Sequence, residues 1–524
     1  METAVHTRPT ANAEAELKLI APAGTLERLR EAPPIARYAR DTGAVRQLDA
    51  VYYDTLDRTL FSNGLSLRVR RSGDGFIQTL KRGPAQGEPF VRAEWESEIA
   101  GTVPDLSLLP ADEIGTPLDG LGSCVVGPVF TTKVHRRSLQ LDLPGAVVEA
   151  AFDDGVIESG EHREPVSEVE LELKSGDLRA LYDLGLQLLE IAPLRLGTRS
   201  KSDRGYSLSF GVSPKSTKAA SPAISPDHTI DDIIGMLLGS CQDHLLANQA
   251  VAEAGLDPEG VHQMRVALRR MRTISALLHR QVGLPTLEAF NAEAKWLGRV
   301  LGAAREWDVF VTDTLRAPSE ALGREADFEA LRQAAEPHRT TAYAGLREAL
   351  ASTRYNRLQL AMRQWIHSRG WRNELQSKPL AVLLETAHDF ASRTLAQLHL
   401  MVVKRGAHFQ HLRPEDRHQV RIALKKLRYT AEFFRHSLRG NDQIPGFLAN
   451  IAKLQNVLGR DNDAAMTAPL LSTLERDELA QGVQRSIGVV AGWQARDRLT
   501  EAQALKKQWR RFKAAAPHWL GRSD

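Results

Sequence analysis

The segment Ser167–Lys174 constrains the fold more than any other part of the chain, because acidic and apolar residues alternate in it without a break. An alternation of period two predicts a β-strand, in which side chains at i, i+2 and i+4 share one face. Glu168, Glu170 and Glu172 then lie roughly 6–7 Å apart on that face. Because three like charges at this spacing repel, we expect a divalent metal ion or basic side chains opposite them. A strand with a solvated acidic face is the alternative for a single such stretch.

The same alternation recurs between residues 13 and 210, and each predicted strand carries ionisable side chains on one face and aliphatic ones on the other. A sheet that covers a surface seldom needs this repetition. A closed antiparallel barrel with a charged interior explains it, because closure also removes the sheet edges. The charged strand positions are Glu14, Glu16, Lys18, Arg68, Arg70, Lys81, Arg92, Glu94, Glu96, Arg136, Glu149 and Asp153.

These residues resemble the CYTH domains, also called triphosphate tunnel metalloenzymes. The resemblance implies an eight-stranded antiparallel tunnel over residues 13–210. It rests on Glu-x-Glu-x-Lys at Glu14, Glu16 and Lys18, the turn Tyr52-Tyr53-Asp54-Thr55, the run Leu67-Arg68-Val69-Arg70, Lys81, the three glutamates above, and the closing Ser200-Lys201-x-x-Arg204-Gly205-Tyr206.

Triphosphate hydrolysis depends mainly on positioning and on charge neutralisation, and carboxylates suit Mg²⁺ or Mn²⁺ as ligands. The predicted metal ligands are Glu14, Glu16, Glu168, Glu170 and Glu172. The resemblance implies catalytic roles for Glu14 and Glu16 and phosphate contacts for Lys18, Arg68, Arg70, Lys81, Arg136 and Lys201. Arg92, Glu94, Glu96, Glu149 and Asp153 are second choices, which either join the site or pair with one another in the lumen.

The chain divides into an acidic first part and a basic second part. Residues 1–210 hold 24 Lys and Arg against 32 Asp and Glu, whereas the remainder holds 44 against 33. The first suits metal binding and the second a polyanion. Residues 1–12 are predicted to be a loose tail, Ser175–Ile191 a helix, and 211–227 a linker rich in Pro and Ser. Only Cys124 and Cys241 are present, which fits a reducing cytoplasm.

From residue 228 to 524 the apolar period changes to 3.6, which predicts an all-helical domain. This part repeats after about 156 residues, and each copy carries a basic stripe and an apolar face on one helix. Acidic partners at helical spacing are absent from both stripes in this interpretation, so an anion would offset their repulsion. A solvated basic face is the alternative. The stripe residues are His262, Arg265, Arg269 and Arg272, matched by His418, Arg421, Lys425 and Arg428.

The helical part resembles the CHAD domains. The stripes match its His-x-x-Arg-x-x-x-(Arg/Lys)-x-x-Arg helices. A second segment follows in each copy, and that of the first copy matches its Leu-Gly-x-x-Arg-Asp-x-Asp pattern, with Glu306 in place of the first Asp and Asp308 retained. The resemblance implies two pseudo-symmetric halves and binding of inorganic polyphosphate. Lys295, Arg299 and Lys453 lie near the starts of the second segments and join the predicted polyphosphate-binding residues.

Together these observations predict an α+β protein that hydrolyses inorganic triphosphate to pyrophosphate and phosphate in a tunnel and binds polyphosphate through its helices. Adenylate cyclase or thiamine or nucleoside triphosphatase activity is one alternative, and a non-catalytic polyphosphate-binding scaffold is another. Nucleic-acid binding by the basic half is less expected. No membrane-spanning stretch is found, so we expect a cytoplasmic protein, with polyphosphate granules as a further expected location.

Overall fold

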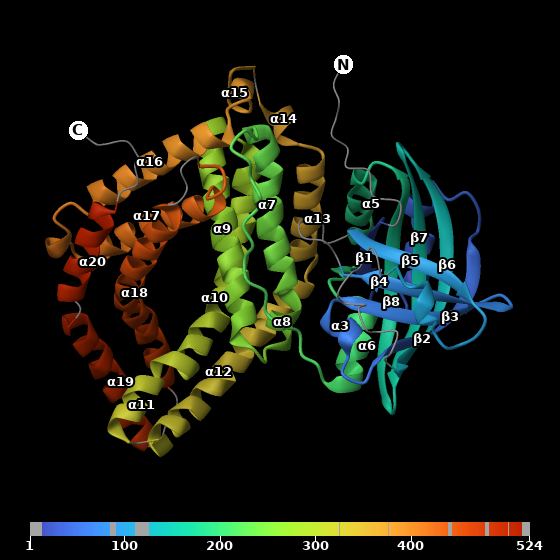
Figure 1. Cartoon of the computed structure of the whole chain (residues 1–524). Helices are drawn as coiled ribbons and strands as arrows, with labels where there is room; N and C mark the ends of the chain where they lie inside the picture. The colour runs from blue at the N-terminus through green and yellow to red at the C-terminus, as the bar shows by residue number, and fades with distance from the viewer. Residues whose placement is uncertain are drawn as a thin grey trace. The chain divides into compact units, whose positions relative to one another are not determined.

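The computed structural model describes residues 13–83, 91–110, 125–323, 325–375, 377–438, 443–476, 481–500 and 502–515. These residues form two compact units (Figure 1). The first comprises residues 1–216 with 249–256 and 350–368, and the second comprises 217–248, 257–349 and 369–524. The predicted tail at residues 1–12 and Cys124 lie outside the described residues.

The first unit is built on one antiparallel sheet with the strand order β5-β4-β3-β2-β6-β7-β8-β1-β9. Strand β1 also pairs with β5 at three positions, so the two ends of the eight-strand order meet there. The predicted antiparallel tunnel is therefore present, with β9 as an unpredicted ninth strand of two residues. The strands are β1 (Ala13–Ile20), β2 (Ala44–Thr55), β3 (Leu65–Ser72), β4 (Gly75–Arg82), β5 (Val91–Ile99), β6 (Val126–Leu143), β7 (Ala146–Ser159), β8 (His162–Gly176) and β9 (Arg195–Leu196).

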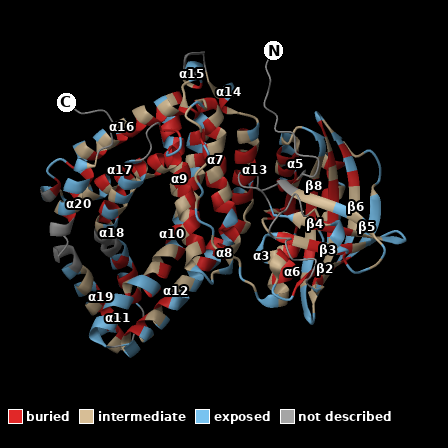
Figure 2. Ribbon diagram, viewed as in Figure 1, coloured by how far each residue is buried: buried red, intermediate tan, exposed pale blue. Residues whose placement is uncertain are grey.

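The alternation read from the sequence separates the two faces of these strands. Leu17 and Leu171, on neighbouring strands β1 and β8, are fully buried and point away from the lumen. They face helix α5 (Arg179–Leu189), where Gly185 lies so close to Leu17 that a Cβ would approach its Cδ2 to 2.8 Å. In Figure 2 both α5 and the strands contain red, buried segments. The outer face of β1 and β8 is thus a packed core.

Two local predictions in the first unit are wrong. The predicted helix from Ser175 begins only at Arg179, because β8 continues to pair with β7 as far as Gly176, whose φ of +98° then turns the chain. The predicted turn at Tyr52–Thr55 is the last part of strand β2, paired with β6. Its Asp54 nonetheless organises the following turn, since its carboxylate accepts hydrogen bonds from the backbone N–H groups of Leu60 and Phe61. The unit's helices are α1 (Leu26–Arg30), α2 (Pro33–Ala36), α3 (Thr59–Ser62), η1 (Leu106–Leu108), α5, α6 (Lys201–Phe210), α8 (Gln249–Ala254) and α13 (Thr353–His367).

The second unit is helical and carries the predicted repeat. Helix α7 packs against α9 and α9 against α10 in the first copy, and α16 packs against α17 and α17 against α18 in the second. Its helices are α7 (Ile230–Ala247), α9 (Pro258–Val282), α10 (Pro285–Val309), η4 (Phe310–Thr314), α11 (Arg316–Leu322), α12 (Glu325–Ala351), α14 (Trp371–Glu374), α15 (Ser377–Val382), α16 (Ala387–Arg405), η5 (Phe409–His411), α17 (Pro414–Phe433), α18 (Ile444–Leu474), α19 (Gln481–Thr500) and α20 (Ala502–Ala514).

The two copies begin at one shared point. Thr229 and Thr386 form an isolated antiparallel bridge, and each is the N-cap residue of the first helix of its copy. The Ile230 N–H donates to Glu385 O at 3.0 Å, and the Ala387 N–H donates to His228 O at 2.7 Å. This reciprocal pairing is what a pseudo-twofold relation between the copies requires.

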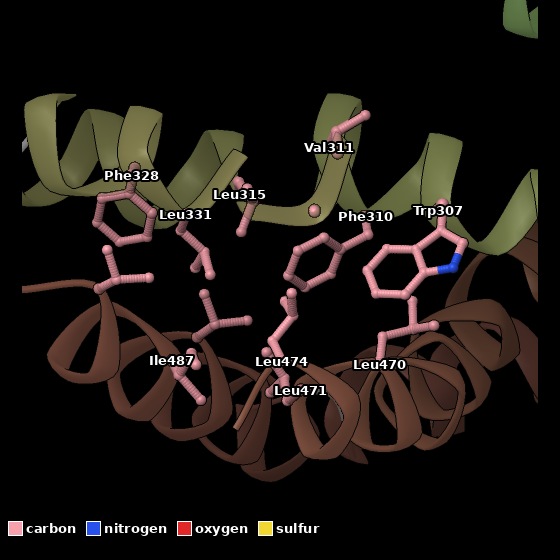
Figure 3. Close-up of a cluster of buried hydrophobic side chains, with 13 residues drawn as sticks. Trp307, Phe310, Val311, Leu315, Phe328, Leu331, Leu470, Leu471, Leu474 and Ile487 are labelled. Atoms are coloured by element: carbon pink, nitrogen blue, oxygen red, sulfur yellow. The ribbon is translucent and has the colours of Figure 1, made fainter. Parts of the chain in front are cut away.

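The copies also meet in an apolar cluster at the far ends of their second helices (Figure 3). Trp307 and Phe310 of the first copy lie opposite Leu470 and Leu474 of the second, and Ile487 of α19 extends the same layer. Fully burying side chains of this size stabilises a fold by about 1.5–3 kcal/mol each. The repeat therefore folds as one helical unit.

Candidate functional site

A cavity of about 470 Å³ lies within the ring of strands, lined by the inward faces of all eight long strands and by the start of α6. Among the residues that the structure describes, nine acidic and nine basic side chains line it. The walls thus carry no formal net charge. The predicted residues that line it are Glu14, Glu16, Lys18, Arg68, Arg70, Lys81, Arg136, Glu170, Glu172 and Lys201.

One part of the lumen is a buried and fully paired ionic cluster. The Lys201 ammonium lies 2.7 Å from Asp153 and 2.9 Å from Glu170, and it also contacts Glu168. Lys18 contacts Glu170 and lies 3.1 Å from Glu168. Although burial opposes it, the carboxylates of Asp153, Glu170 and Glu168 raise the pKa of Lys201 well above its usual value. Oxygens of Asp153, Glu168 and Glu170 lie within 4.8 Å of one another, so these three could hold a metal ion only in exchange for the lysines.

Asp153 is central to this cluster, although the sequence placed it only among the second choices. It is fully buried and accepts hydrogen bonds of 2.7 and 2.6 Å from the Nε and Nη2 atoms of Arg136. The cross-strand register explains the grouping, because Asp153 lies opposite Glu168 on β8 and opposite Arg136 on β6. The alternation on β7 indicated its face, but only the register shows its neighbours.

Helix α6 positions Lys201 at the lumen, and its motif residues fix the helix to the barrel. The hydroxyl of Ser200 and the carboxylate of Asp203 form a reciprocal capping box at the first turn. Arg204 donates from Nε to Glu164 at 2.6 Å. Gly205 lies against the Phe130 ring, where a Cβ would come within 2.2 Å of a ring carbon, so only glycine fits. Tyr206 donates its hydroxyl proton to Asp54 at 2.6 Å.

A second part of the lumen is rich in carboxylates and short of cations. Lys81 lies 3.2 Å from Glu14 and 2.6 Å from Glu94. Burial and the interaction with Glu94 raise the pKa of Glu14 to about 8. Against the effect of burial, Glu14 and Lys81 lower the pKa of Glu94 to about 2. The two carboxyl groups therefore share one proton at neutral pH, as carboxylates do when too few positive charges surround them.

Glu172 extends this cation-poor part. It lies directly opposite Glu16 in the pairing of β8 with β1, and opposite Glu149 on β7. Burial, together with Glu149 and Glu16, raises the pKa of Glu172, although Lys174 lies only 2.6 Å away. Oxygen ligands with excess negative charge fit a hard divalent cation. Among the described residues Glu14, Glu16 and Glu172 each lie within 3.4 Å of one lysine, whereas Glu168 and Glu170 each contact three basic side chains.

The second-choice residues Glu96 and Glu149 contact lumen cations outside the second-choice set. Glu96 lies 3.1 Å from Arg70 and accepts a hydrogen bond from the Thr79 hydroxyl at 3.0 Å. Glu149 lies 3.4 Å from Lys174. The side chain of Arg92 lies outside the described residues.

In the helical unit, the first basic stripe lies beside its own copy's second helix. Arg265 donates from Nη1 to the Gly298 carbonyl at 3.1 Å, and Arg272 donates from Nε to Asn291 at 3.2 Å. Burial, then Arg269 and Arg305, lower the pKa of Arg265 to about 10. Cations that destabilise one another in this way form a site that an anion would relieve.

In the second copy the expectation of no acidic partner is wrong for Arg428, which lies 2.8 Å from Glu432 one turn later and donates to Gln455 at 2.8 Å. The other three residues of the second stripe differ in burial: Arg421 and Lys425 are half-buried and His418 is exposed. Lys295, Arg299 and Lys453 are exposed on the second helices. The side chains of Asp461 and Asp463 lie outside the described residues.

Across the repeat, the two copies bring further cations together. Burial, then Arg405, Arg272 and Arg280, lower the pKa of Lys426, so cations of α9, α16 and α17 gather around it. Of these four cations, Lys426, Arg405, Arg272 and Arg280, only Arg272 belongs to a predicted stripe. That the full stripes face each other across the pseudo-twofold axis stays a prediction.

Comparison with known proteins finds two family models that match consecutive parts of the chain. Residues 12–206 match the model of the CYTH domain family, and residues 236–472 match that of the CHAD domain family. The inorganic triphosphatase of Haemophilus influenzae is 30% identical over 167 residues, which cover 31% of this chain and 46% of that protein. The chain thus spans less than half the length of that relative.

Two further relatives cover more of the helical part. An uncharacterised protein of Mycobacterium tuberculosis is 28% identical over 413 residues, or 74% of this chain and 75% of that one. The crystal structure of the CHAD domain from the plant Ricinus communis is 29% identical, with a TM-score of 0.49, and covers 56% of this chain and 96% of that one. No described helix has the length and apolar character needed to span a membrane.

Proposed function

Since the chain consists of a CYTH domain followed by a CHAD domain, we propose that its tunnel hydrolyses inorganic triphosphate to pyrophosphate and phosphate and that its helical unit binds inorganic polyphosphate. The observation that supports the first part most strongly is the charge of the lumen. Nine acidic and nine basic side chains among the described residues line a cavity of about 470 Å³. A triphosphate brings several negative charges into walls with no net charge, so entry requires added cations.

The carboxylates of Glu14, Glu16 and Glu172 fit this requirement. Among the described residues each of these three contacts one lysine, whereas Glu168 and Glu170 each contact three basic side chains. Burial is the main cause that raises the pKa values of Glu14 and Glu172. We propose that the three carboxylates hold Mg²⁺ or Mn²⁺. When bound, such an ion offsets the negative charge of the phosphoryl groups. Glu168 and Glu170 stay in the proposed set as ligands that become available only when Lys18 and Lys201 turn to another partner.

Basic residues of the lumen supply the contacts with the substrate. Lys18, Lys201 and Arg136 each contact carboxylates now, and phosphate oxygens can replace those carboxylates as acceptors. Arg68 and Lys81 approach from the opposite strands. Strands on all sides hold the reacting bond of the substrate in a fixed position and limit the access of water. Such positioning, together with charge neutralisation, provides most of the rate enhancement in phosphoryl transfer.

The decisive experiment for the tunnel is phosphate release from inorganic triphosphate, ATP and thiamine triphosphate, with Mg²⁺, with Mn²⁺ and with EDTA. We expect turnover of inorganic triphosphate that EDTA abolishes. Glu16→Gln should lower the rate at least about 100-fold, whereas Glu161→Gln, an exposed glutamate at the turn between β7 and β8, should not. Turnover that survives EDTA rejects the metal, and conversion of ATP to cyclic AMP would favour the cyclase alternative.

The support for polyphosphate binding is the crowding of cations between α9 and α10, where Arg269 of α9 and Arg305 of α10 help to lower the pKa of Arg265. A long linear polyanion relieves such repulsion along its length. The full-length double variant Arg265→Glu with Arg421→Glu should lose binding of long-chain polyphosphate while hydrolysing triphosphate nearly normally. The matched control reverses Arg476 and Arg485, two exposed arginines in the turn after α18 and on α19, for the same change in charge. Equal losses in both double variants would show a non-specific charge effect and reject the stripe.

A further inference from the structure

Arg46 is a lumen cation that the proposed catalytic groups do not include. It lies on β2 on the same face as Leu48, Ala50 and Tyr52, and all four line the cavity. The next two residues on the other face, Gln47 and Asp49, hydrogen bond to each other outside. The alternation of β2 therefore directs Arg46 inward, although it remains solvent-exposed.

Its lack of an acidic neighbour distinguishes Arg46 from the cations deeper in the lumen. Those cations each have a carboxylate within 3.5 Å. For Arg46 the described part of the chain provides no ion pair and no hydrogen-bond partner for the guanidinium. Arg82 also lines the cavity, but it lies close to residues 84–90, which are outside the described residues. The cations with carboxylate partners are Lys18, Arg68, Arg70, Lys81, Arg136, Lys174 and Lys201.

The sheet register places Arg46 beside the proposed phosphate contacts. It lies directly opposite Arg136 in the pairing of β2 with β6. Directly opposed like charges ordinarily destabilise an antiparallel pair, and here only Arg136 is neutralised, by Asp153 and Glu170. On its other side β2 pairs with β3 only from Ala50 onward, so Arg46 extends past the end of that pairing, toward a rim of the barrel.

From this position we propose that Arg46 is a specificity residue, which binds the second free end of a linear triphosphate. This inference rests on the proposed function. Inorganic triphosphate ends in two charged phosphoryl groups, whereas in a nucleoside triphosphate one end is esterified to a sugar. A guanidinium without an acidic partner forms paired, charge-assisted hydrogen bonds with a terminal phosphoryl group. An esterified end offers one non-bridging oxygen and about one negative charge fewer and carries the sugar, so the guanidinium binds it less strongly and favours the inorganic substrate.

The test compares kcat/KM for inorganic triphosphate and for ATP in the full-length protein with Mg²⁺. Arg46→Gln should lower the ratio of the two values about 10- to 100-fold, the usual worth of a hydrogen bond to a charged group. Most of the loss should appear in KM for inorganic triphosphate, and Arg46→Lys should recover part of it. The control is Arg71→Gln, an exposed arginine on β3 outside the lumen lining.

The outcomes separate this inference from the proposed function. No turnover of inorganic triphosphate by the unsubstituted protein rejects both. Turnover by the unsubstituted protein with an unchanged substrate ratio in Arg46→Gln rejects the role of Arg46 alone. Equal loss for both substrates in that variant, with an unchanged melting temperature, also rejects it, because it would show a general contribution to binding the triphosphate rather than recognition of one end.

Discussion

Replacing Asp153 by Asn tests the ionic cluster that the tunnel is built around. Asn has almost the same shape as Asp but no charge, so the change leaves Arg136 and Lys201 without their shared, fully buried counter-charge. Removing one member of a buried ion pair typically costs about 3–5 kcal/mol, because the remaining charge stays buried. We expect a loss of that size in the free energy of unfolding of the tunnel unit.

Hydrogen exchange measured by mass spectrometry is the suitable assay, because it resolves peptides of the tunnel from those of the helices. A loss of about 3–5 kcal/mol corresponds to roughly 10²- to 10⁴-fold faster exchange of the most protected amides. These should belong to β6, β7 and β8, whose pairings surround Asp153. Peptides of α9 and α10 provide an internal reference.

The matched control is Asp154→Asn, one residue along the same strand. Asp154 is exposed, so its alternate position directs it away from the cluster, and a surface change of this kind should stay within about 0.5 kcal/mol. The double variant Asp153→Asn with Arg136→Gln should lose less than the sum of its single changes, because it removes one of the two cations that Asp153 neutralises. Similar exchange in the Asp153 and Asp154 variants would refute the view that paired charges hold this part of the lumen together.

Three other outcomes are expected. Burial and Arg270 lower the pKa of His244 from 6.5 to about 4, so between these pH values the unfolded state binds a proton that the folded state does not. The free energy of unfolding should therefore fall by up to about 3 kcal/mol as the pH falls from 6.5 to 4. In denaturant titrations, His244→Gln should reduce this dependence of the free energy of unfolding on pH. Gly205→Ala should cost about 1–3 kcal/mol through its clash with Phe130, whereas Gly345→Ala, in open space within a helix, should raise the melting temperature. Affinity for polyphosphate, measured by titration calorimetry, should rise with chain length and fall linearly on a logarithmic salt scale, and salt-independent binding would contradict the cationic groove.

The sequence predicted strands in the first unit and helices in the second, because apolar residues recur with a period of two throughout the first and with a period of 3.6 throughout the second. The alternation around Glu168, Glu170 and Glu172 identified the inward face of β8, and the same reasoning placed Lys18 in the lumen. Lys201, on helix α6, was expected there only from the resemblance to the CYTH domains. Relative charge was harder to predict. Which carboxylates lysines neutralise depends on register between strands about 150 residues apart, as in the contact of Lys18 with Glu168.

The misplaced boundaries have local causes that composition does not reveal. The helix expected from Ser175 begins only at Arg179, because β8 stays paired with β7 beyond the last residue of the alternating acidic and apolar pattern. β9 was missed because two residues carry no period. Arg46 was missed because its neighbours on β2 are apolar, so its strand lacked the repeated charges that identified the others.

The bridge between Thr229 and Thr386 has a consequence for synthesis of the protein. The first repeat has its starting backbone groups satisfied by residues about 157 positions later in the chain. At a translation rate of about 5–20 residues per second, roughly 10–30 s pass before that partner has been made. Until then the opening helix of the first repeat lacks its final neighbour, and contacts this distant in sequence form slowly. The nascent helical unit should therefore remain sensitive to proteases and available to chaperones until translation passes residue 386.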